Sequence, residues 1–155
     1  MKPKIAEGPF HAFYDPMKAV YDGLMAKYGG DFDIVRAEMP KVNYVVDSLP
    51  SRIQKAMKTT AELLFFSSDT LAKQLSHHPE LTQQEYVGVF CGIKGYTGNV
   101  YDRGQGSAGL VIEAGGRCYR VILKPTLNLL EVYLVSISSL NADTLREFLN
   151  SKPII

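Results

Sequence analysis

The sequence predicts an α+β fold, in which N-terminal helices pack on a small antiparallel β-meander and a last helix closes the C-terminus. Three observations support this prediction. Apolar residues follow a helical period in the first part of the chain, glycines interrupt it between positions 92 and 106, and runs rich in β-branched and aromatic residues follow. The 155 residues suit a single domain, with an N-terminal helical extension over 1–60 and an α+β core over 61–155.

The first expected helix starts at Asp15, an N-cap residue that stands before a proline, and it ends at the glycine pair 29–30. Apolar side chains recur at helical spacing between these two points. The segment 31–47 mixes short apolar groups with a proline and has no clear assignment. Another helix is expected over 48–57, because a proline stands in its first turn and its apolar residues share one side.

The middle of the chain predicts two short helices joined by a sharp corner. Residues 61–66 form a short buried strand or a helix end, and Ser67 and Ser68 are cap residues for a helix over 69–78. Pro79 ends that helix, since the residue before a proline is pushed out of the helical region. A T-x-x-E capping box at positions 82–85 then starts a helix over 83–91.

The last third of the chain predicts strands and a final helix. Strands over 109–113 and 117–124 flank an Ala-Gly-Gly turn, which is a strong hairpin signal, and 129–137 forms a third strand. Asn141 caps a helix over 142–149, and its inward-facing residues are expected to be Leu145, Phe148 and Leu149.

Composition narrows the class of protein. The net charge of +1 gives no general argument for nucleic-acid binding, although residues 94–124 carry five Lys/Arg against two Asp/Glu. The start MKPKIAEGPF has no leader pattern, and no apolar run approaches the roughly 18 residues of a membrane span. The two cysteines have no C-x-x-C spacing. We therefore expect a cytoplasmic protein with no membrane association, no metal and no cofactor.

Two groups of residues are candidates for chemistry. On the 69–78 helix, Lys73 and His77 are four apart and share a face, whereas His78 falls with the apolar stripe. Each histidine has two interpretations. In the structural interpretation, His77 is a cation favoured at a helix C-terminus and His78 is a half-buried packing residue; in the functional one, a histidine acts as a general acid or base near neutral pH.

The second group lies on the predicted strands. Strand alternation places Arg120 and Lys124 on one face, where they either grip a phosphate or simply face solvent. Ser136 and Ser138 share a face of the next strand, where hydroxyls can orient a phosphate. The G-x-G-x-x-G match at 104–109 is followed by a strand and not by a helix, so it does not indicate dinucleotide binding.

The run from 64 to 86, LFFSSDTLAKQLSHHPELTQQEY, resembles a segment of phage- and prophage-encoded proteins of the barnase–EndoU–colicin–RelE-like superfamily, the PBECR domains. A helix reading roughly S-[DE]-x-L-x-K-[HQ]-L-x-x-H-P-E-[LI] is typical of that family. The run 116–124, GRCYRVILK, together with 130–138, is similar to its paired strands with a basic residue at one end. The resemblance covers about half of the chain.

The resemblance implies an RNase-like or RelE-like fold and a phage-associated endoribonuclease or toxin. Such proteins cleave RNA without metal, through attack by the ribose 2′-hydroxyl. The site residues carried over are His78 as acid or base, Lys73, and the basic positions Arg120 and Lys124, with Ser136 as the hydroxyl. His77, Arg117 and Ser138 are expected to contact the substrate.

RNA is then the expected partner, with an immunity protein or a virion protein as further possibilities; the oligomeric state has no sequence signal. The alternative function is a non-catalytic interaction module, or virion-associated module, that keeps the same fold. The weak net charge of the chain keeps this alternative open.

Overall fold

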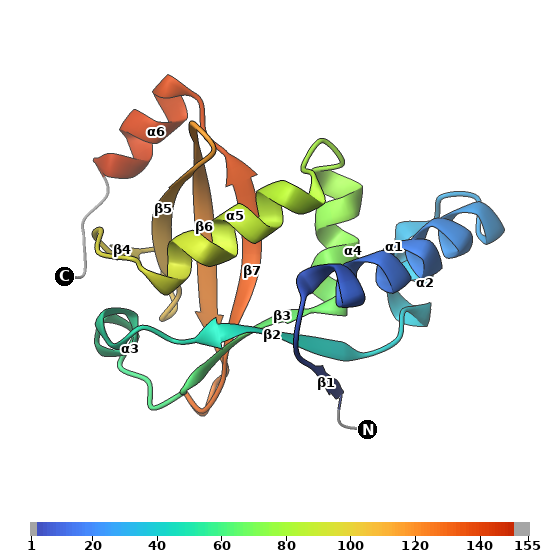
Figure 1. Cartoon of the computed structure of the whole chain (residues 1–155), viewed down its shortest axis with the longest axis horizontal. Coiled ribbons are helices and arrows are strands. Elements are labelled where there is room, and N and C mark those ends of the chain that lie inside the picture. Colours follow the sequence, from blue (N-terminus) through green and yellow to red (C-terminus); the bar gives the residue numbers. More distant parts are fainter. Residues whose placement is uncertain (1–2, 151–155) are drawn as a thin grey trace.

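The computed structural model describes residues 3–150, and this range contains helices and a seven-stranded mixed sheet, as the α+β prediction requires. Figure 1 shows the helices gathered around one strongly twisted sheet. In chain order the elements are β1 (Lys4–Ala6), α1 (Phe10–Lys27), α2 (Phe32–Glu38), β2 (Val42–Ser48), α3 (Ser51–Met57), β3 (Leu63–Ser67), α4 (Ser68–His77), α5 (Gln83–Lys94), β4 (Tyr101–Asp102), β5 (Ala108–Ala114), β6 (Arg117–Pro125), β7 (Val132–Ser139) and α6 (Ala142–Leu149).

The sheet has the strand order β1-β2-β3-β7-β6-β5-β4. The predicted antiparallel meander is present as β5, β6 and β7, and the β5–β6 hairpin turns at two glycines with positive φ, Gly115 and Gly116. The rest of the sheet is mixed, because β1 pairs with β2 and β3 pairs with β7 in parallel. Two of the strands, β1 and β2, come from the segment 1–60, which therefore contributes more than the expected helices.

The first helix begins earlier than predicted. It starts at Phe10, after Pro9, and Pro16 lies inside it, so the prediction of a start at Asp15 was wrong. The extra turn buries Phe10, Phe13 and Tyr14 in the main core, and the burial of three aromatic side chains outweighs the hydrogen bond that Pro16 removes. The capping residue and the proline are local signals, and they do not reveal which side chains are buried in the folded core.

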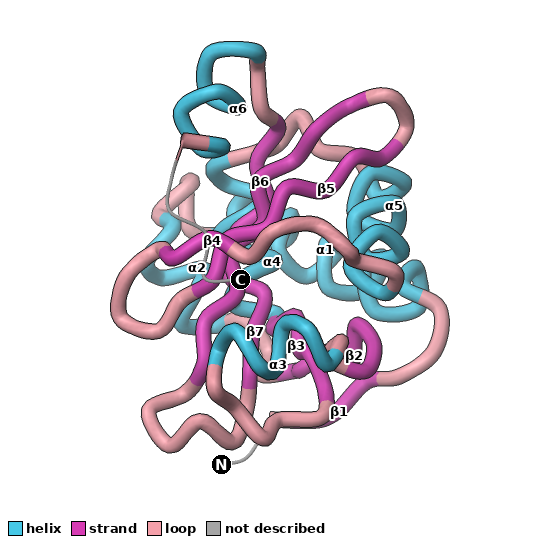
Figure 2. Tube along the Cα trace, turned by 90° about the vertical axis from the view of Figure 1, so that its left-hand side faces the viewer, coloured by secondary structure: helices cyan, strands magenta, loops and turns pink. Residues whose placement is uncertain are grey.

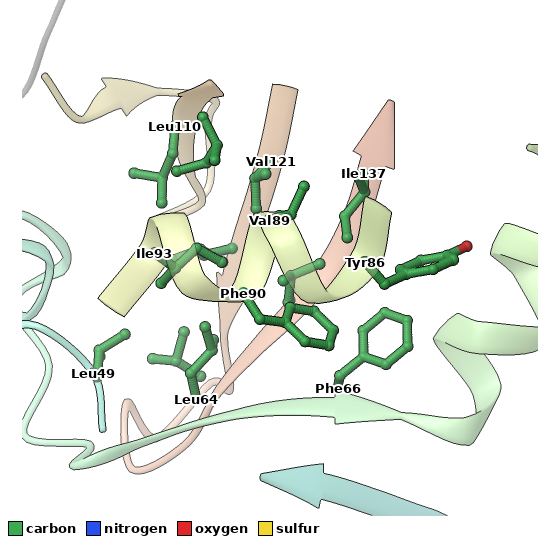
Figure 3. Packing of buried hydrophobic residues seen from close by; sticks show 14 of the residues in the cluster. Leu49, Leu64, Phe66, Tyr86, Val89, Phe90, Ile93, Leu110, Val121 and Ile137 are labelled. Atoms are coloured by element: carbon green, nitrogen blue, oxygen red, sulfur yellow. The ribbon is translucent and has the colours of Figure 1, made fainter. Parts of the chain in front are cut away.

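The main core lies between one face of the sheet, here called the core face, and helices α1, α3 and α5. Figure 3 shows how α5 fits into the angle between β3 and the β5–β7 meander. Phe66 of β3 packs against Tyr86 and Phe90 of α5, with ring centroids 5.9 and 5.6 Å apart. The capping box predicted for this helix is present, and the helix runs to Lys94. The helix α5 therefore joins the two differently oriented halves of the sheet.

On β6 the predicted alternation is confirmed, since Tyr119, Val121 and Leu123 are buried on the core face. The opposite surface, here called the open face, carries Cys118, Arg120, Ile122 and Lys124. In β7 a one-residue register shift beside Ile122 and Leu123 interrupts the alternation. Because of this bulge, Leu134 and Ile137 both reach the core although they are three residues apart.

The closing helix α6 has the bounds that the sequence predicts, and the side chain of Asn141 accepts a hydrogen bond from the backbone N–H of Thr144. Its orientation differs from the prediction in one residue. Phe148 is buried and Leu145 is half-buried, but Leu149 is 49% exposed, so the expectation that it faces inward was wrong. An eight-residue helix at the end of the sheet has room to bury a single large side chain there.

The edge of β7 beside α4 is completed by side chains and not by a strand. β3 pairs with β7 at Leu64–Val132 and Phe65–Tyr133, and then the chain enters α4 at Ser68. Beyond this point the fully buried side chain of Gln74 donates to the carbonyl of Ile137 (2.8 Å) and accepts from its N–H (3.1 Å). A single amide thus replaces the missing strand at this residue.

We predict that Gln74→Leu lowers the free energy of unfolding by about 2–4 kcal/mol, because it leaves a buried N–H and a buried carbonyl unpaired. Urea denaturation of the purified variant measures this. Gln84→Leu on the exposed side of α5 is the matched control, and its expected effect is within about 0.5 kcal/mol. Equal effects of the two substitutions would contradict this account of the β7 edge.

Candidate functional site

A groove opens on the open face of the sheet, between the start of α4 and the turn that joins β6 to β7. Its volume is about 710 Å³. Polar side chains from two separate segments line it, together with the ring of Tyr133 and the apolar groups of Pro125, Leu127 and Val135. The polar lining residues are Ser67, Asp69, Thr70, Lys124, Thr126 and Asn128.

Lys73 lies at the edge of this groove. Its Nζ donates a hydrogen bond to the carbonyl of Val135, a lining residue, at 2.6 Å. Burial, and then the positive charges of Arg36 and Lys124, lower the pKa of Lys73, while Asp69 opposes this shift. Lys124 lines the groove itself, whereas Lys73 is linked to it through its hydrogen bond to the lining residue Val135.

Lys124 is the accessible cation of the pair. It is exposed on β6, directly opposite Tyr133 of β7, and among the described residues it has no ion-pair or hydrogen-bond partner. The Tyr133 hydroxyl accepts from the amide of Asn43 at 3.0 Å, and its ring packs against Phe65 with the centroids 5.6 Å apart. The wall beside Lys124 is therefore held in place by neighbouring strands.

Asp69 is held in the groove by a guanidinium from another helix. Arg36 of α2 donates to both carboxylate oxygens, from Nε at 2.6 Å and from Nη2 at 2.8 Å. These hydrogen bonds lower the pKa of Asp69, against the opposing effect of its partial burial. Since Arg36 neutralises Asp69, the carboxylate does not offset the positive charge of Lys124 in the groove.

The two histidines lie outside this groove. The helix α4 ends at His77, so His78 has non-helical backbone angles, and its Nδ1 lies 3.4 Å from a carboxylate oxygen of Glu80. The His77 ring packs against Phe32 of α2, with the centroids 5.8 Å apart. Neither histidine lines the groove with Lys124, and the role of His78 as acid or base stays a prediction.

Arg120 shares the open face with Lys124, but the two occupy different places. Four strand residues separate their Cα atoms by roughly 13 Å, and Arg120 lines a small cavity next to α6. Ser138 pairs with Arg120, and Ser136 pairs with Ile122, across the β6–β7 ladder, so both serines are on the open face between the two cations. The structure thus places Lys124 in the groove and Lys73 beside its lining residue Val135, while Arg120 lines a different cavity.

Arg117, expected to contact substrate, belongs to a third location. Its Nη1 lies 3.6 Å from a carboxylate oxygen of Glu85 on α5, and the same oxygen accepts from the hydroxyl of Tyr119 at 2.5 Å. The tyrosine hydrogen bond is the main cause that lowers the pKa of Glu85. Because Glu85 also completes the capping box of α5, the cluster has a structural explanation.

Across residues 3–150, no group of three His, Cys, Asp or Glu side chains is arranged to hold a metal ion. None of the helices described in this range has the length and apolar character needed to cross a bilayer.

Comparison of the chain with protein-family models, with curated proteins and with solved structures found no match.

Three residues of the site were not predicted from the sequence: Asp69, Arg36 and Tyr133. Asp69 occupies the acidic position of the helix motif, so the motif itself contained that signal. Arg36 lies in the segment 31–47, which had no secondary-structure assignment, and its partner is 33 residues away. No local pattern predicts an ion pair of this kind.

The shifted pKa of Asp69 gives a prediction about pH. In the folded protein its pKa lies below the roughly 3.9 of an unfolded chain, so its stabilising effect is complete above that value. The effect is lost as the pH falls through the folded pKa. We expect Asp69→Asn to unfold at lower urea concentration than the wild type at pH 7, and the difference to disappear toward pH 2.

Glu38→Gln, at an exposed position near the end of α2, is the control for loss of a carboxylate. A difference between Asp69→Asn and wild type that stays constant from pH 7 to pH 2 would show that the ion pair with Arg36 is not its source.

Proposed function

We propose that this protein is an RNase-like RNA-binding protein whose phosphate site is the groove between α4 and the β6–β7 turn. One observation carries the proposal: the exposed cation Lys124 lines this groove, and Lys73, from a segment far away in the sequence, donates a hydrogen bond to the lining residue Val135. The ammonium group of Lys124 neutralises a backbone phosphate, and Lys124 has no ion-pair partner among the described residues that competes for it.

The surroundings of the two lysines suit a nucleotide better than a bare anion. Beside Lys124 the groove has an apolar wall, formed by Pro125, Leu127 and the Tyr133 ring, on which a base or a ribose can pack. The side chain of Asn128 also lines the groove; its Oδ1 accepts from Thr126 and from the N–H of Leu130, which fixes the amide in place. The charge and the wall lie side by side.

For cleavage, we propose attack by the ribose 2′-hydroxyl on the adjacent phosphorus. The O2′–P bond forms and the P–O5′ bond breaks, which leaves a 2′,3′-cyclic phosphate and a free 5′-hydroxyl. A base must take the 2′-hydroxyl proton, and the leaving oxygen must receive one. We assign the proton transfer to Lys73, which lies beside the groove and whose pKa is lowered chiefly by burial, and the stabilisation of charge at the phosphoryl oxygens to Lys124.

This proposal assigns His78 no part in the chemistry, since it lies beside Glu80 and outside the groove. Arg120 and Ser138 also do not contact the reacting phosphate in this mechanism, because they lie on the open face farther along the strands.

A non-catalytic interaction module is the second candidate, and a specific observation favours it. Leucines project from the β6–β7 turn and the start of β3, where Leu127 is fully exposed and Leu130 and Leu63 are 62% and 37% exposed. Exposed apolar groups that cluster in this way are typical of protein contact sites. If the protein is such a module, it binds no RNA, and substitution of Lys124 does not change RNA binding or cleavage.

We expect the wild type to bind a fluorescently labelled single-stranded RNA, and Lys124→Ala to bind it about tenfold more weakly, since one charge-assisted contact is lost. Fluorescence anisotropy over a series of salt concentrations measures this. The slope of log affinity against log salt should fall by about 0.7, the value for one phosphate on a single strand. Lys27→Ala, an exposed lysine at the end of α1, is the matched control.

Incubation with transfer RNA in EDTA then separates binding from cleavage. Cleavage that ends in a cyclic phosphate, and that Lys73→Met abolishes while RNA binding persists, supports the nuclease. Binding without cleavage reduces the proposal to an RNA-binding protein. Folded wild-type protein with no RNA affinity, or equal affinities of Lys124→Ala and Lys27→Ala, would contradict it.

A further inference from the structure

We propose that α6 is a lid over a second oxyanion site, formed by Arg103 and Arg120 on the open face of the sheet. Figure 2 shows α6 at the upper end of the β5–β6 hairpin, on the side away from α5. This site is separate from the groove at Lys124, and the experiment that tests it uses no RNA.

The lid is held by one side chain in a fitted socket. Phe148 is 4% exposed, and its ring contacts Tyr101 of β4 edge to face, with the centroids 5.0 Å apart. The guanidinium carbon of Arg103 lies 5.0 Å from the centre of the same ring. The floor of the socket is Gly109 of β5, where an added Cβ would come within 2.5 Å of Phe148 Cζ. Glycine at this position therefore makes room for the ring.

The rest of α6 does little to hold it in place. Phe148 is its buried residue, Leu145 is half-buried, and the other positions are exposed. A helix of eight residues is marginal without tertiary contacts, even with a capping box at Asn141 and Thr144. The contact between Phe148 and its socket therefore determines whether the helix is docked on the sheet.

The docked helix covers an arginine whose hydrogen bonding is incomplete. The Nε of Arg120 is buried and has no hydrogen-bond partner among the described residues. Arg120 lines a cavity of about 140 Å³, which is also lined by Arg103, Leu140, Thr144, Glu147 and Phe148. A buried guanidinium N–H without an acceptor is costly, and a phosphate or a related oxyanion is the ligand that satisfies it best.

Glu147 explains why this site suits regulation. It lines the cavity from the lid, so the docked helix brings a carboxylate to the neighbourhood of two arginines. An incoming anion must displace that carboxylate together with the lid. When α6 leaves, Arg120 becomes accessible beside Ser138, its partner across the ladder, on the same face as Lys124. The open face then carries an anion site at each end of β6.

The test uses phenylglyoxal, which modifies accessible arginines, with mass spectrometry to measure the rate at Arg120. Two variants release the lid: Phe148→Ala removes the latch, and Gly109→Ala fills the socket. Leu149→Ala is the matched control, since it removes an exposed apolar side chain from the same helix. Arg146, exposed on α6, is the internal reference for reagent activity.

We expect modification of Arg120 to be slow in the wild type and in Leu149→Ala, and about tenfold faster in the two released variants. Sodium pyrophosphate, as the oxyanion probe, should slow the reaction in the released variants. Hydrogen exchange should increase over Ala142–Leu149 in these variants while β5–β7 stay protected, which separates lid release from unfolding. If Phe148→Ala fails this check, Gly109→Ala carries the test.

Equal rates at Arg120 in the wild type and in the released variants would show that α6 does not cover it. Released variants that leave Arg120 unreactive would also contradict the proposal. Absence of pyrophosphate protection would overturn the oxyanion site, whatever the outcome of the RNA experiments on Lys124.

Discussion

The arrangement of this protein depends on how the edge of β7 is satisfied where β3 leaves it. A strand in the middle of a sheet must pair on both sides, yet β3 turns into α4 after pairing at Phe65–Tyr133. Gln74 and Lys73 of α4 supply the missing partners at Ile137 and Val135. This requirement fixes the position of α4 against the sheet, and with it the edge of the groove.

The same contacts give a structural meaning to the helix motif. The Lys-Gln pair at 73–74 matches its K-[HQ] positions, and both side chains bind the backbone of β7. The Pro-Glu pair that follows His78 ends the helix. Much of the pattern is therefore explained by folding alone, since Lys73 and Gln74 both bind the backbone of β7.

The sequence predicted the fold where signals are local. Capping residues at Ser67, Thr82 and Asn141 gave three helices within a few residues, and the Gly115-Gly116 turn gave the hairpin. Local signals failed at the start of α1, where burial against residues far away in the sequence determines the helix boundary. They also failed for β1, which pairs in parallel with a strand far along the chain. At the candidate site, strand alternation predicted that Arg120 and Lys124 share a face, but no local pattern predicted that they line different cavities.

That separation follows from strand geometry. Residues four apart on a strand share a face but lie roughly 13 Å from each other, so Arg120 and Lys124 belong to the same surface without sharing one phosphate. Two cations at that distance suit an extended polyanion better than a single small one. The position of α6 over Arg120 then determines how much of the open face such a ligand can reach, since Lys124 stays exposed at the other end of β6.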